Sequence, residues 1–171
     1  MYIKIPLLTA VMPARKAIVT PLQSLDEIAA PLAKALDNIG FSRARPYEFA
    51  RRNSPIDFTV RLDPSAVNLS SGKTQVYLNF GYRIPEGMDA HTTTFPENAE
   101  LACIARECGI VEYGLIGHAR NTQLTLPECH GRYVAFPQDT SRAELKNGLC
   151  SFIRHVSVYV ACRTHPKKQE T

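Results

Sequence analysis

The fold of this chain is decided by two stretches, Ile56-Asp57-Phe58-Thr59-Val60-Arg61-Leu62 and Thr74-Gln75-Val76-Tyr77-Leu78-Asn79-Phe80-Gly81-Tyr82-Arg83-Ile84. Apolar residues recur at every second position in both stretches, so each has one apolar face. A period of two is typical of antiparallel strands that are buried on one side only. The two stretches therefore predict strands of one sheet with an apolar face and a polar face.

The segments around these strands read as further strand, turn and loop. A basic, aromatic segment, residues 40–52, precedes them, and we expect a strand over 47–52 followed by a tight turn at Asn53-Ser54-Pro55. Residues 63–73 are rich in Ser, Asn, Pro and Gly, which predicts an exposed loop. Pro85-Glu86-Gly87 is expected to end the strand over 74–84.

Two helices are predicted on either side of this strand region. Ser24 and Glu27 have capping-box spacing, and the apolar residues that follow keep helical spacing as far as Gly40, a residue that suits a left-handed helix cap. Pro31 interrupts this helix over 24–38, so we expect a kink or a late start there. A second helix over 96–108 is expected to end at Gly109.

The remainder of the chain is less regular. Residues 110–120 are apolar without a clear period, and short strands are predicted over 122–126 and 132–136, around a turn at Pro127-Glu128-Cys129-His130-Gly131. A second capping box, Ser141 and Glu144, begins the last element. Residues 155–163 fit both a helix and a strand, and we favour one long helix.

This order of elements predicts an α+β fold in which helices pack on one face of an antiparallel sheet. The 171 residues fit a single domain, which we expect over residues 24–165, after an N-terminal extension (1–23) and before a polar tail (166–171). Met12 is an alternative start to Met1.

The amino-acid composition excludes some classes of protein but does not indicate one function. The net charge is only +4, although thirteen Arg outnumber seven Lys. No apolar run reaches the eighteen or so residues that a membrane span needs, so we expect no membrane association. Five unevenly spaced cysteines argue against a secreted disulfide scaffold and favour the cytoplasm. No metal-binding or phosphate-loop motif is present, and we expect neither a metal nor another cofactor.

The polar face of the sheet is the first candidate site. We expect it to be left open by the helices or to meet a partner, because nothing else in the sequence predicts a cover for it. Tyr and Arg dominate binding hot spots, so the expected partner contacts are Arg61, Tyr77, Asn79 and Arg83.

RNA binding is a second hypothesis. Four arginines of the basic segment, Arg43, Arg45, Arg51 and Arg52, lie close in sequence to Tyr47 and Phe49. Arginines beside exposed aromatic rings on a sheet are one way in which single-stranded RNA is held. The modest net charge and the absence of a ribonucleoprotein sheet signature weaken this hypothesis.

A hydrolase is the third hypothesis, and the sequence favours it less than a role without catalysis. Its site would be assembled from residues 110–131 and would require His118, Cys129 and His130 to converge. A nucleophilic cysteine needs a lowered pKa, from a helix start or a nearby cation, and no motif around Cys129 provides one.

Four short motifs carry a family resemblance over residues 25–84. They are Gly40-Phe41 at a helix end, Phe49-Ala50-Arg51, the strand over 56–62, and Tyr77-Leu78-Asn79-Phe80-Gly81. In these the chain resembles a family of uncharacterised bacterial α+β domains. Some relatives lie in toxin–immunity neighbourhoods, so the resemblance implies a small partner-binding protein of the immunity or antitoxin type. It implies no site residues, and Pro31 and the long N-terminal segment depart from its pattern.

Overall fold

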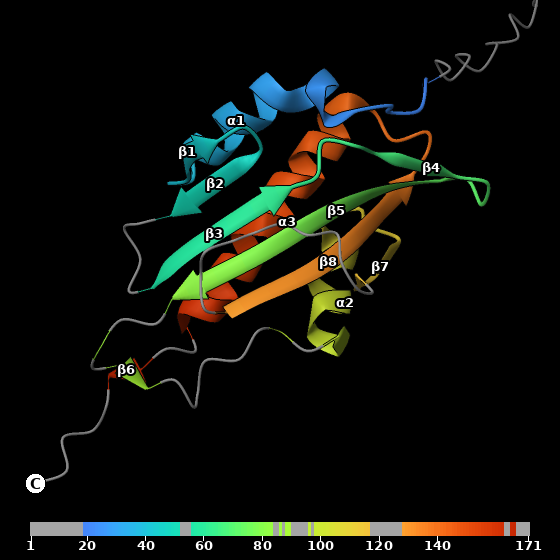
Figure 1. Ribbon diagram of the computed structural model, residues 1–171. Coiled ribbons are helices and arrows are strands. Elements are labelled where there is room, and N and C mark those ends of the chain that lie inside the picture. The colour runs from blue at the N-terminus through green and yellow to red at the C-terminus, as the bar shows by residue number, and fades with distance from the viewer. Residues whose placement is uncertain are drawn as a thin grey trace, which may run out of the picture.

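The computed structural model describes residues 19–51, 56–83, 86, 88–89, 96, 98–116, 128–162 and 165–166. These residues form an α+β fold around one antiparallel sheet of seven strands, as predicted (Figure 1). Six strands follow the order β1-β2-β3-β5-β8-β7, and β4 pairs with β5 beside this row. Their bounds are β1 Ser42–Arg45, β2 Glu48–Arg51, β3 Asp57–Leu62, β4 Val67–Leu69, β5 Lys73–Arg83, β7 Glu112–Leu115 and β8 Glu128–Pro137.

The centre of the sheet is the pair of strands that the alternating pattern predicted. In β3 and β5 the register sets Phe58 opposite Tyr82 and Val60 opposite Phe80, so the apolar faces of the two strands are continuous. These four side chains are buried. β8 continues the sheet on the other side of β5, with Val134 opposite Val76.

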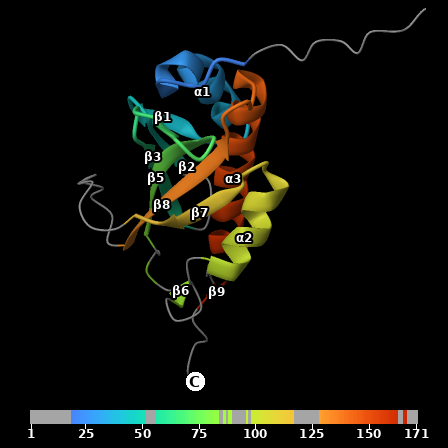
Figure 2. The same cartoon turned by 90° about the vertical axis from the view of Figure 1, so that its right-hand side faces the viewer.

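Three helices cover this apolar face, and they all lie on the same side of the sheet (Figure 2). A single 3-10 turn, η1 Leu25–Ile28, leads into α1 Ala29–Asp37, and the other two helices are α2 Asn98–Glu107 and α3 Arg142–Cys162. The long α3 confirms the helical alternative for 155–162. The opposite side of the sheet carries no described helix.

Capping explains where the first helix begins. Ser24 and Glu27 form the predicted capping box, and the α-helix proper starts only at Ala29. Pro31 therefore falls in the first turn, where the N–H that proline lacks would have had no partner within the helix. The predicted late start is confirmed. Gly40 follows the helix with a φ of 92°, in the left-handed region that the predicted cap requires.

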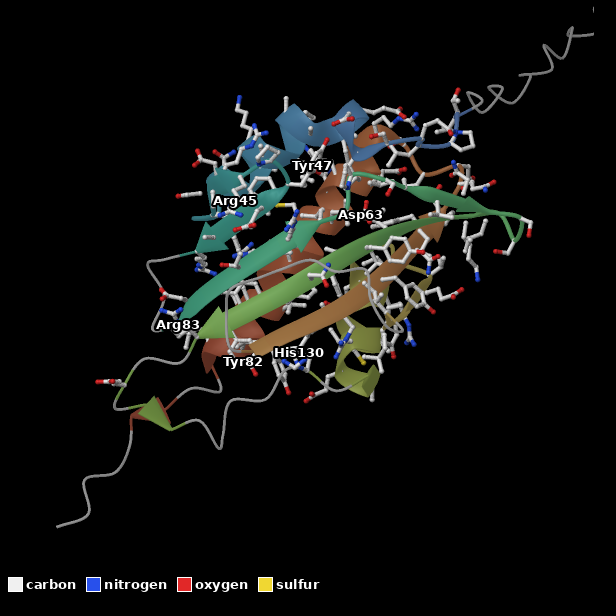
Figure 3. The ribbon with its side chains drawn as sticks, viewed as in Figure 1. Arg45, Tyr47, Asp63, Tyr82, Arg83 and His130 are labelled. Carbon is white, nitrogen blue, oxygen red and sulfur yellow. The ribbon has the colours of Figure 1, made fainter. Side chains whose placement is uncertain are left out.

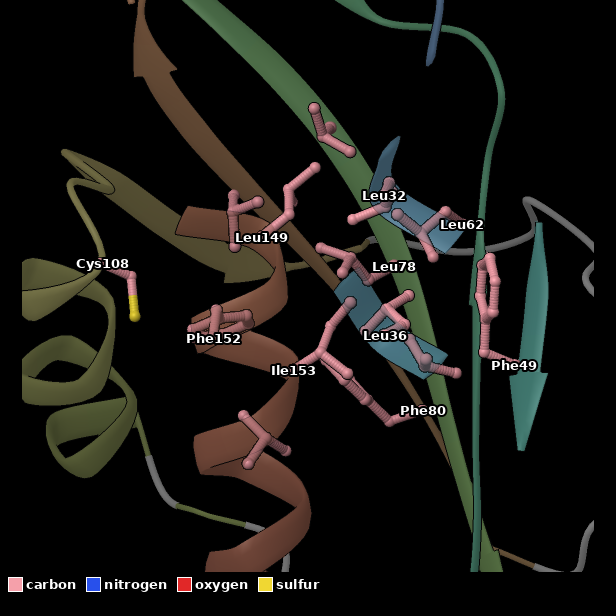
Figure 4. Packing of buried hydrophobic residues seen from close by; sticks show 14 of the residues in the cluster. Leu32, Leu36, Phe49, Leu62, Leu78, Phe80, Cys108, Leu149, Phe152 and Ile153 are labelled. Atoms are coloured by element: carbon pink, nitrogen blue, oxygen red, sulfur yellow. The ribbon is translucent and has the colours of Figure 1, made fainter. Parts of the chain in front are cut away.

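The core lies between α3, α1 and the sheet (Figure 4). Phe41, Phe58, Phe80 and Phe152 form a continuous row of rings with centroid separations of 6.2, 5.9 and 6.2 Å. These rings come from the loop after α1, from β3, from β5 and from α3. They therefore connect the first helix to the last through the sheet, and aromatic contacts of this kind add to the stability that burial provides.

Within the seven-stranded sheet, the structure differs from the sequence predictions at three strands and one turn. β1, β4 and β7 were not predicted, since β1 is exposed throughout and the other two are short and lack alternation. The turn predicted at 127–131 is wrong from Glu128 onward, because Glu128–Gly131 pair with β5 as the first residues of β8. The predicted turn at 53–55 and strand over 122–126 lie outside the described residues.

The ends of the predicted domain are also packed. Leu22, expected in the extension, is 1% exposed and belongs to the core, and its carbonyl accepts a hydrogen bond from Asn68 Nδ2 at 3.0 Å. At the other end, β9 His165–Pro166 pairs with β6 Met88–Asp89 as a small separate sheet. The described structure thus includes residues on both sides of the predicted domain, 24–165.

Candidate partner-binding surface

The side of the sheet that faces away from the helices is called the open face here. Strand alternation and register place on it residues of β3, β5, β7 and β8. They are Asp57, Thr59, Arg61, Lys73, Gln75, Tyr77, Asn79, Gly81, Arg83, Glu112, Gly114, Gly131, Tyr133 and Ala135. The polar residues that alternate with the apolar ones in the two stretches are all among them: Asp57, Thr59, Arg61, Gln75, Tyr77, Asn79 and Arg83. The prediction of a polar face opposite the helices is confirmed.

Two tyrosines lie side by side in the middle of the open face. Tyr77 of β5 is directly opposite Tyr133 of β8, and both side chains are half-buried. The Tyr77 hydroxyl donates to Gln75 Oε1 at 3.3 Å, and the Tyr133 hydroxyl donates to Glu112 Oε1 at 3.2 Å. We call Tyr77, Tyr133, Gln75, Glu112 and Lys73 the tyrosine cluster.

Gly114 provides the space that Tyr133 occupies. It lies opposite Tyr133 in β7, and a Cβ at this glycine would come within 2.5 Å of the tyrosine ring. The ring therefore lies over the backbone of β7, where it reaches Glu112. A glycine covered by a cross-strand aromatic ring fixes the position of that ring, which is the preorganisation that a binding surface needs.

An ion pair holds the outer end of the tyrosine cluster. Lys73 Nζ donates to Glu112 Oε2 at 2.5 Å. The hydrogen bonds from Lys73 and Tyr133 lower the pKa of Glu112 below its ordinary value of 4.5. Burial, together with the hydrogen bond to the Glu112 carboxylate, raises the pKa of Tyr133. At neutral pH the cluster thus presents a neutral phenol beside a charge-balanced pair.

The four predicted partner contacts are not equally accessible. Arg61 and Tyr77 are half-buried, and Arg83 is exposed at the end of β5 (Figure 3). Asn79 is on the same face but only 6% exposed, and Gly81 beside it is also buried. The accessible parts of the open face are therefore the end that carries Arg83 and the region of Arg61 and the tyrosine cluster. Of the four predicted contacts, Asn79 is the least accessible to a partner.

The described arginines of the basic segment lie on both sides of the sheet. Arg45 pairs in register with Glu48 and so lies on the open face, whereas Arg43 is opposite Phe49 and lies on the helix side. Arg51 also lies on the helix side, where its Nη1 donates to Ser157 Oγ of α3 at 3.3 Å. Arg52 lies outside the described residues. Of the three described arginines, Arg45 thus lies on the opposite side of the sheet from Arg43 and Arg51.

Charge on the open face is mixed. The basic residues Arg45, Arg61, Arg83 and Lys73 share it with the acidic residues Glu48, Asp57 and Glu112. Glu48 stands between Arg45 and Arg61 in the same cross-strand row. A phosphate backbone favours an uninterrupted basic track, so this arrangement fits a surface of mixed charge better than a nucleic acid.

Of the three residues of the hypothetical hydrolase site, the structure describes the side chain of only His130. His130 lies on the helix side of β8, opposite Phe80, and its ring stacks on Tyr82 with a centroid separation of 5.7 Å (Figure 3). His118 and the side chain of Cys129 lie outside the described part of the chain. No group of three or more His, Cys, Asp or Glu residues with metal-binding geometry occurs among the residues that the structure describes.

Sequence reasoning missed most of the tyrosine cluster. Tyr133 had a usable signal, since Val134 and Phe136 alternate toward the core and leave Tyr133 on the polar face. Lys73 was taken as the end of a loop. Glu112 and Gly114 carried no signal, because β7 is only four residues long and the segment around it has no period.

Comparisons with known proteins identified no relative of this chain. No protein-family model, no curated protein and no solved structure matches the chain. Within the described residues, the helices are all too short or too polar to cross a membrane.

Proposed function

We propose that this chain is a protein-binding module that docks a partner protein on its open face. The observation that carries the proposal is the Tyr77–Tyr133 pair, which is held half-exposed by hydrogen bonds and by Gly114 on the side of the sheet without helices. Rigid aromatic side chains of this kind are the usual hot spots of protein interfaces, since they bury large areas at little entropic cost.

The surroundings of the pair support the same proposal. Arg61 and the Lys73–Glu112 ion pair flank the tyrosines, which gives an aromatic centre with a charged rim. Protein interfaces commonly combine such a centre with such a rim. Inhibition of a partner by occlusion, in the manner of an immunity protein or an antitoxin, is the form that the family resemblance implies, and the cytoplasmic location remains a prediction.

The test is affinity capture from a lysate of the native host, with and without nuclease, followed by mass spectrometry. The wild-type chain is compared with the double variant Tyr77→Ala/Tyr133→Ala and with Arg154→Ala, which changes an exposed residue of α3 on the other side of the molecule. We expect one stoichiometric protein that resists nuclease, and at least about 30-fold weaker binding by the double variant, since even one hot-spot tyrosine contributes about 2 kcal/mol or more.

Three results would contradict the proposal. Capture that the double variant retains would place the interface elsewhere, provided that circular dichroism shows the variant to be folded. Loss of capture on nuclease treatment would favour RNA, the second hypothesis. Equal losses in the double variant and in Arg154→Ala would show that the tyrosines have no specific role.

A further inference from the structure

The turn between β1 and β2 contains a backbone conformation that its residue disfavours. Tyr47 has a φ of 62°, and it is the one non-glycine residue with a positive φ in the described part of the chain. It follows Pro46 in a two-residue loop, which the pairing of Arg45 with Glu48 closes. A proline, with its fixed negative φ, followed by a positive φ is the pattern of a type II turn, in which glycine is the preferred second residue. The turn is therefore strained at Tyr47.

The strand on one side of this turn, β1, is weakly held. All four of its residues are exposed, so burial of apolar surface stabilises it little. Its register with β2 shifts between Arg43 and Arg45. A type II turn also splays the two strands of a hairpin, because its twist does not match theirs. Segments with so few buried contacts open locally at a low free energy, so β1 is the part of this hairpin that opens first.

Tyr47 connects the strained turn to the first helix (Figure 3). Its hydroxyl donates to Asp26 Oδ1 in η1, 21 residues earlier in the chain. Groups of the capping box hold that carboxylate in place: Asp26 Oδ2 accepts from Ser24 Oγ at 3.1 Å, and Asp26 N–H donates to Ser24 Oγ at 3.2 Å. The tyrosine ring packs against the core. The turn is thus fixed by a contact that the β1–β2 hairpin does not itself provide.

The surroundings of Tyr47 keep its hydroxyl available as a donor. Burial, together with the hydrogen bond to Asp26, raises the pKa of Tyr47 to about 12. The phenol therefore stays protonated at neutral pH, and its acceptor is a carboxylate. Hydrogen bonds to a charged acceptor are stronger than those between neutral groups. One bond of this kind is sufficient to offset the strain of the turn.

We propose that the Tyr47–Asp26 hydrogen bond is a latch that keeps the β1–β2 hairpin closed, and that β1 opens from the sheet when this latch breaks. Leu62 N–H donates to Tyr47 O at 2.8 Å, which continues the pairing of β2 with β3, so β2 stays in place and the hinge lies at the turn. In the closed state Arg45 lies beside Glu48 on the open face. Opening removes Arg45 from that face and exposes the backbone groups of β2 that pair with β1. The latch therefore controls both the charge and the strand edge at this end of the sheet.

Amide hydrogen exchange, followed for single residues by NMR, measures this opening. Tyr47→Phe removes the hydroxyl and keeps the ring. The protected amides of β1 should then exchange at least about 10-fold faster, since a hydrogen bond to a charged group contributes about that factor or more to an equilibrium constant. The amides of β3 and β5 should exchange as in the wild-type chain. Asp26→Asn replaces the charged acceptor with a neutral one, so its effect should be smaller, and it should add little to Tyr47→Phe because both changes act on the same bond.

The matched control is Tyr133→Phe, which also removes a tyrosine hydroxyl bonded to a carboxylate, here Glu112 at 3.2 Å. It should leave the exchange of β1 at the wild-type rate. Unchanged exchange of β1 in Tyr47→Phe overturns the proposal, and so does β1 that is already unprotected in the wild-type chain. An equal increase in β1, β3 and β5 also overturns it, because Tyr47 would then stabilise the whole domain.

Asp26→Asn alone gives the same readings if Tyr47→Phe does not fold. The result is independent of the proposed partner binding, because the Tyr47 and Asp26 variants leave Tyr77 and Tyr133 unchanged.

Discussion

The two faces of the sheet are built from the same strands and differ in almost every other respect. On the helix side, β5 contributes Val76, Leu78 and Phe80, all fully buried against α1 and α3. On the open face, the residues between them are Gln75, Tyr77 and Asn79, whose side chains hydrogen-bond or carry polar groups. The comparison teaches that stability and binding can be assigned to alternate residues of one strand, so their substitutions should have separable effects.

The largest expected effect is the loss of a core ring. Phe80→Ala should lower the free energy of unfolding by about 3–5 kcal/mol, because it removes a fully buried ring and leaves a cavity between α3 and the sheet. Tyr77→Ala, three residues earlier on the open face, should cost less than about 1 kcal/mol. Urea unfolding of both variants measures the difference, and similar losses would mean that the open face is part of the core.

Two glycines, one on each side of the sheet, test whether the two sides differ in rigidity. A Cβ at either glycine would come within 2.5 Å of a neighbouring atom. At Gly148 in α3 the neighbour is the backbone carbonyl of Cys108, beside the buried Phe136 ring, and neither can move far. Gly148→Ala should therefore destabilise the protein by about 1–3 kcal/mol, although alanine is the better helix former. At Gly114 the neighbour is the end of the half-buried Tyr133 ring, which can swing outward, so Gly114→Ala should cost less than about 1 kcal/mol.

The control for this pair is Asn147→Ala, at an exposed residue next to Gly148 in the same helix. It should be neutral or slightly stabilising. Gly114→Ala should also lower the pKa of Tyr133 toward its ordinary value, because the displaced hydroxyl loses its hydrogen bond to Glu112. Spectrophotometric titration measures this change, with Tyr133→Phe as the reference that lacks the Tyr133 signal. An equal cost at both glycines would contradict the difference in rigidity between the two faces.

The smallest effect concerns the ion pair of the open face. Hydrogen bonds from Lys73 and Tyr133 lower the pKa of Glu112 in the folded state, so the carboxylate contributes stability above its unfolded pKa of about 4.5. That contribution is lost as pH falls through the lowered folded pKa. Lys73→Gln should therefore be less stable than wild type at pH 7 and nearly equal to it once Glu112 is protonated in both.

Urea unfolding at pH 7 and near pH 3 measures this difference. Tyr133→Phe keeps the ion pair and loses one hydrogen bond, so it should show a smaller pH-dependent difference than Lys73→Gln. A difference between wild type and Lys73→Gln that does not change with pH would show that the lysine acts through packing rather than through charge. Both side chains are about one-third exposed, so solvent keeps the effect small.

The elements that the sequence predicted are those with a local signal. Alternation identified β3 and most of β5, and the two capping boxes located the starts of the first and last helices. Gly40 and Gly109 both have positive φ, as expected of residues that end helices. The short strands were missed because three or four residues are too few to show a period, and β8 was shortened because Pro127-Glu128-Cys129-His130-Gly131 has the composition of a turn.

The candidate site was predicted less well than the fold. Alternation placed Tyr77 and Arg61 on the correct face, but it could not show that Tyr133, 56 residues later, lies opposite Tyr77. It also grouped four arginines of which two lie on opposite sides of the sheet, Arg45 on the open face and Arg51 on the helix side. Neighbours in sequence point to opposite faces of a strand, so a basic run in a strand is divided between them.

By itself the sequence determined the α+β class, the apolar face of the central strands and the helix ends, since periodicity and capping depend on residues within a few positions of each other. Only the tertiary structure decided that β8 lies between β5 and β7, that Tyr133 is opposite Tyr77 with its ring over Gly114, and that β7 is the last described strand of the row. These features depend on pairing between strands far apart in the chain. Such pairing is selected by packing of the whole core rather than by any local pattern.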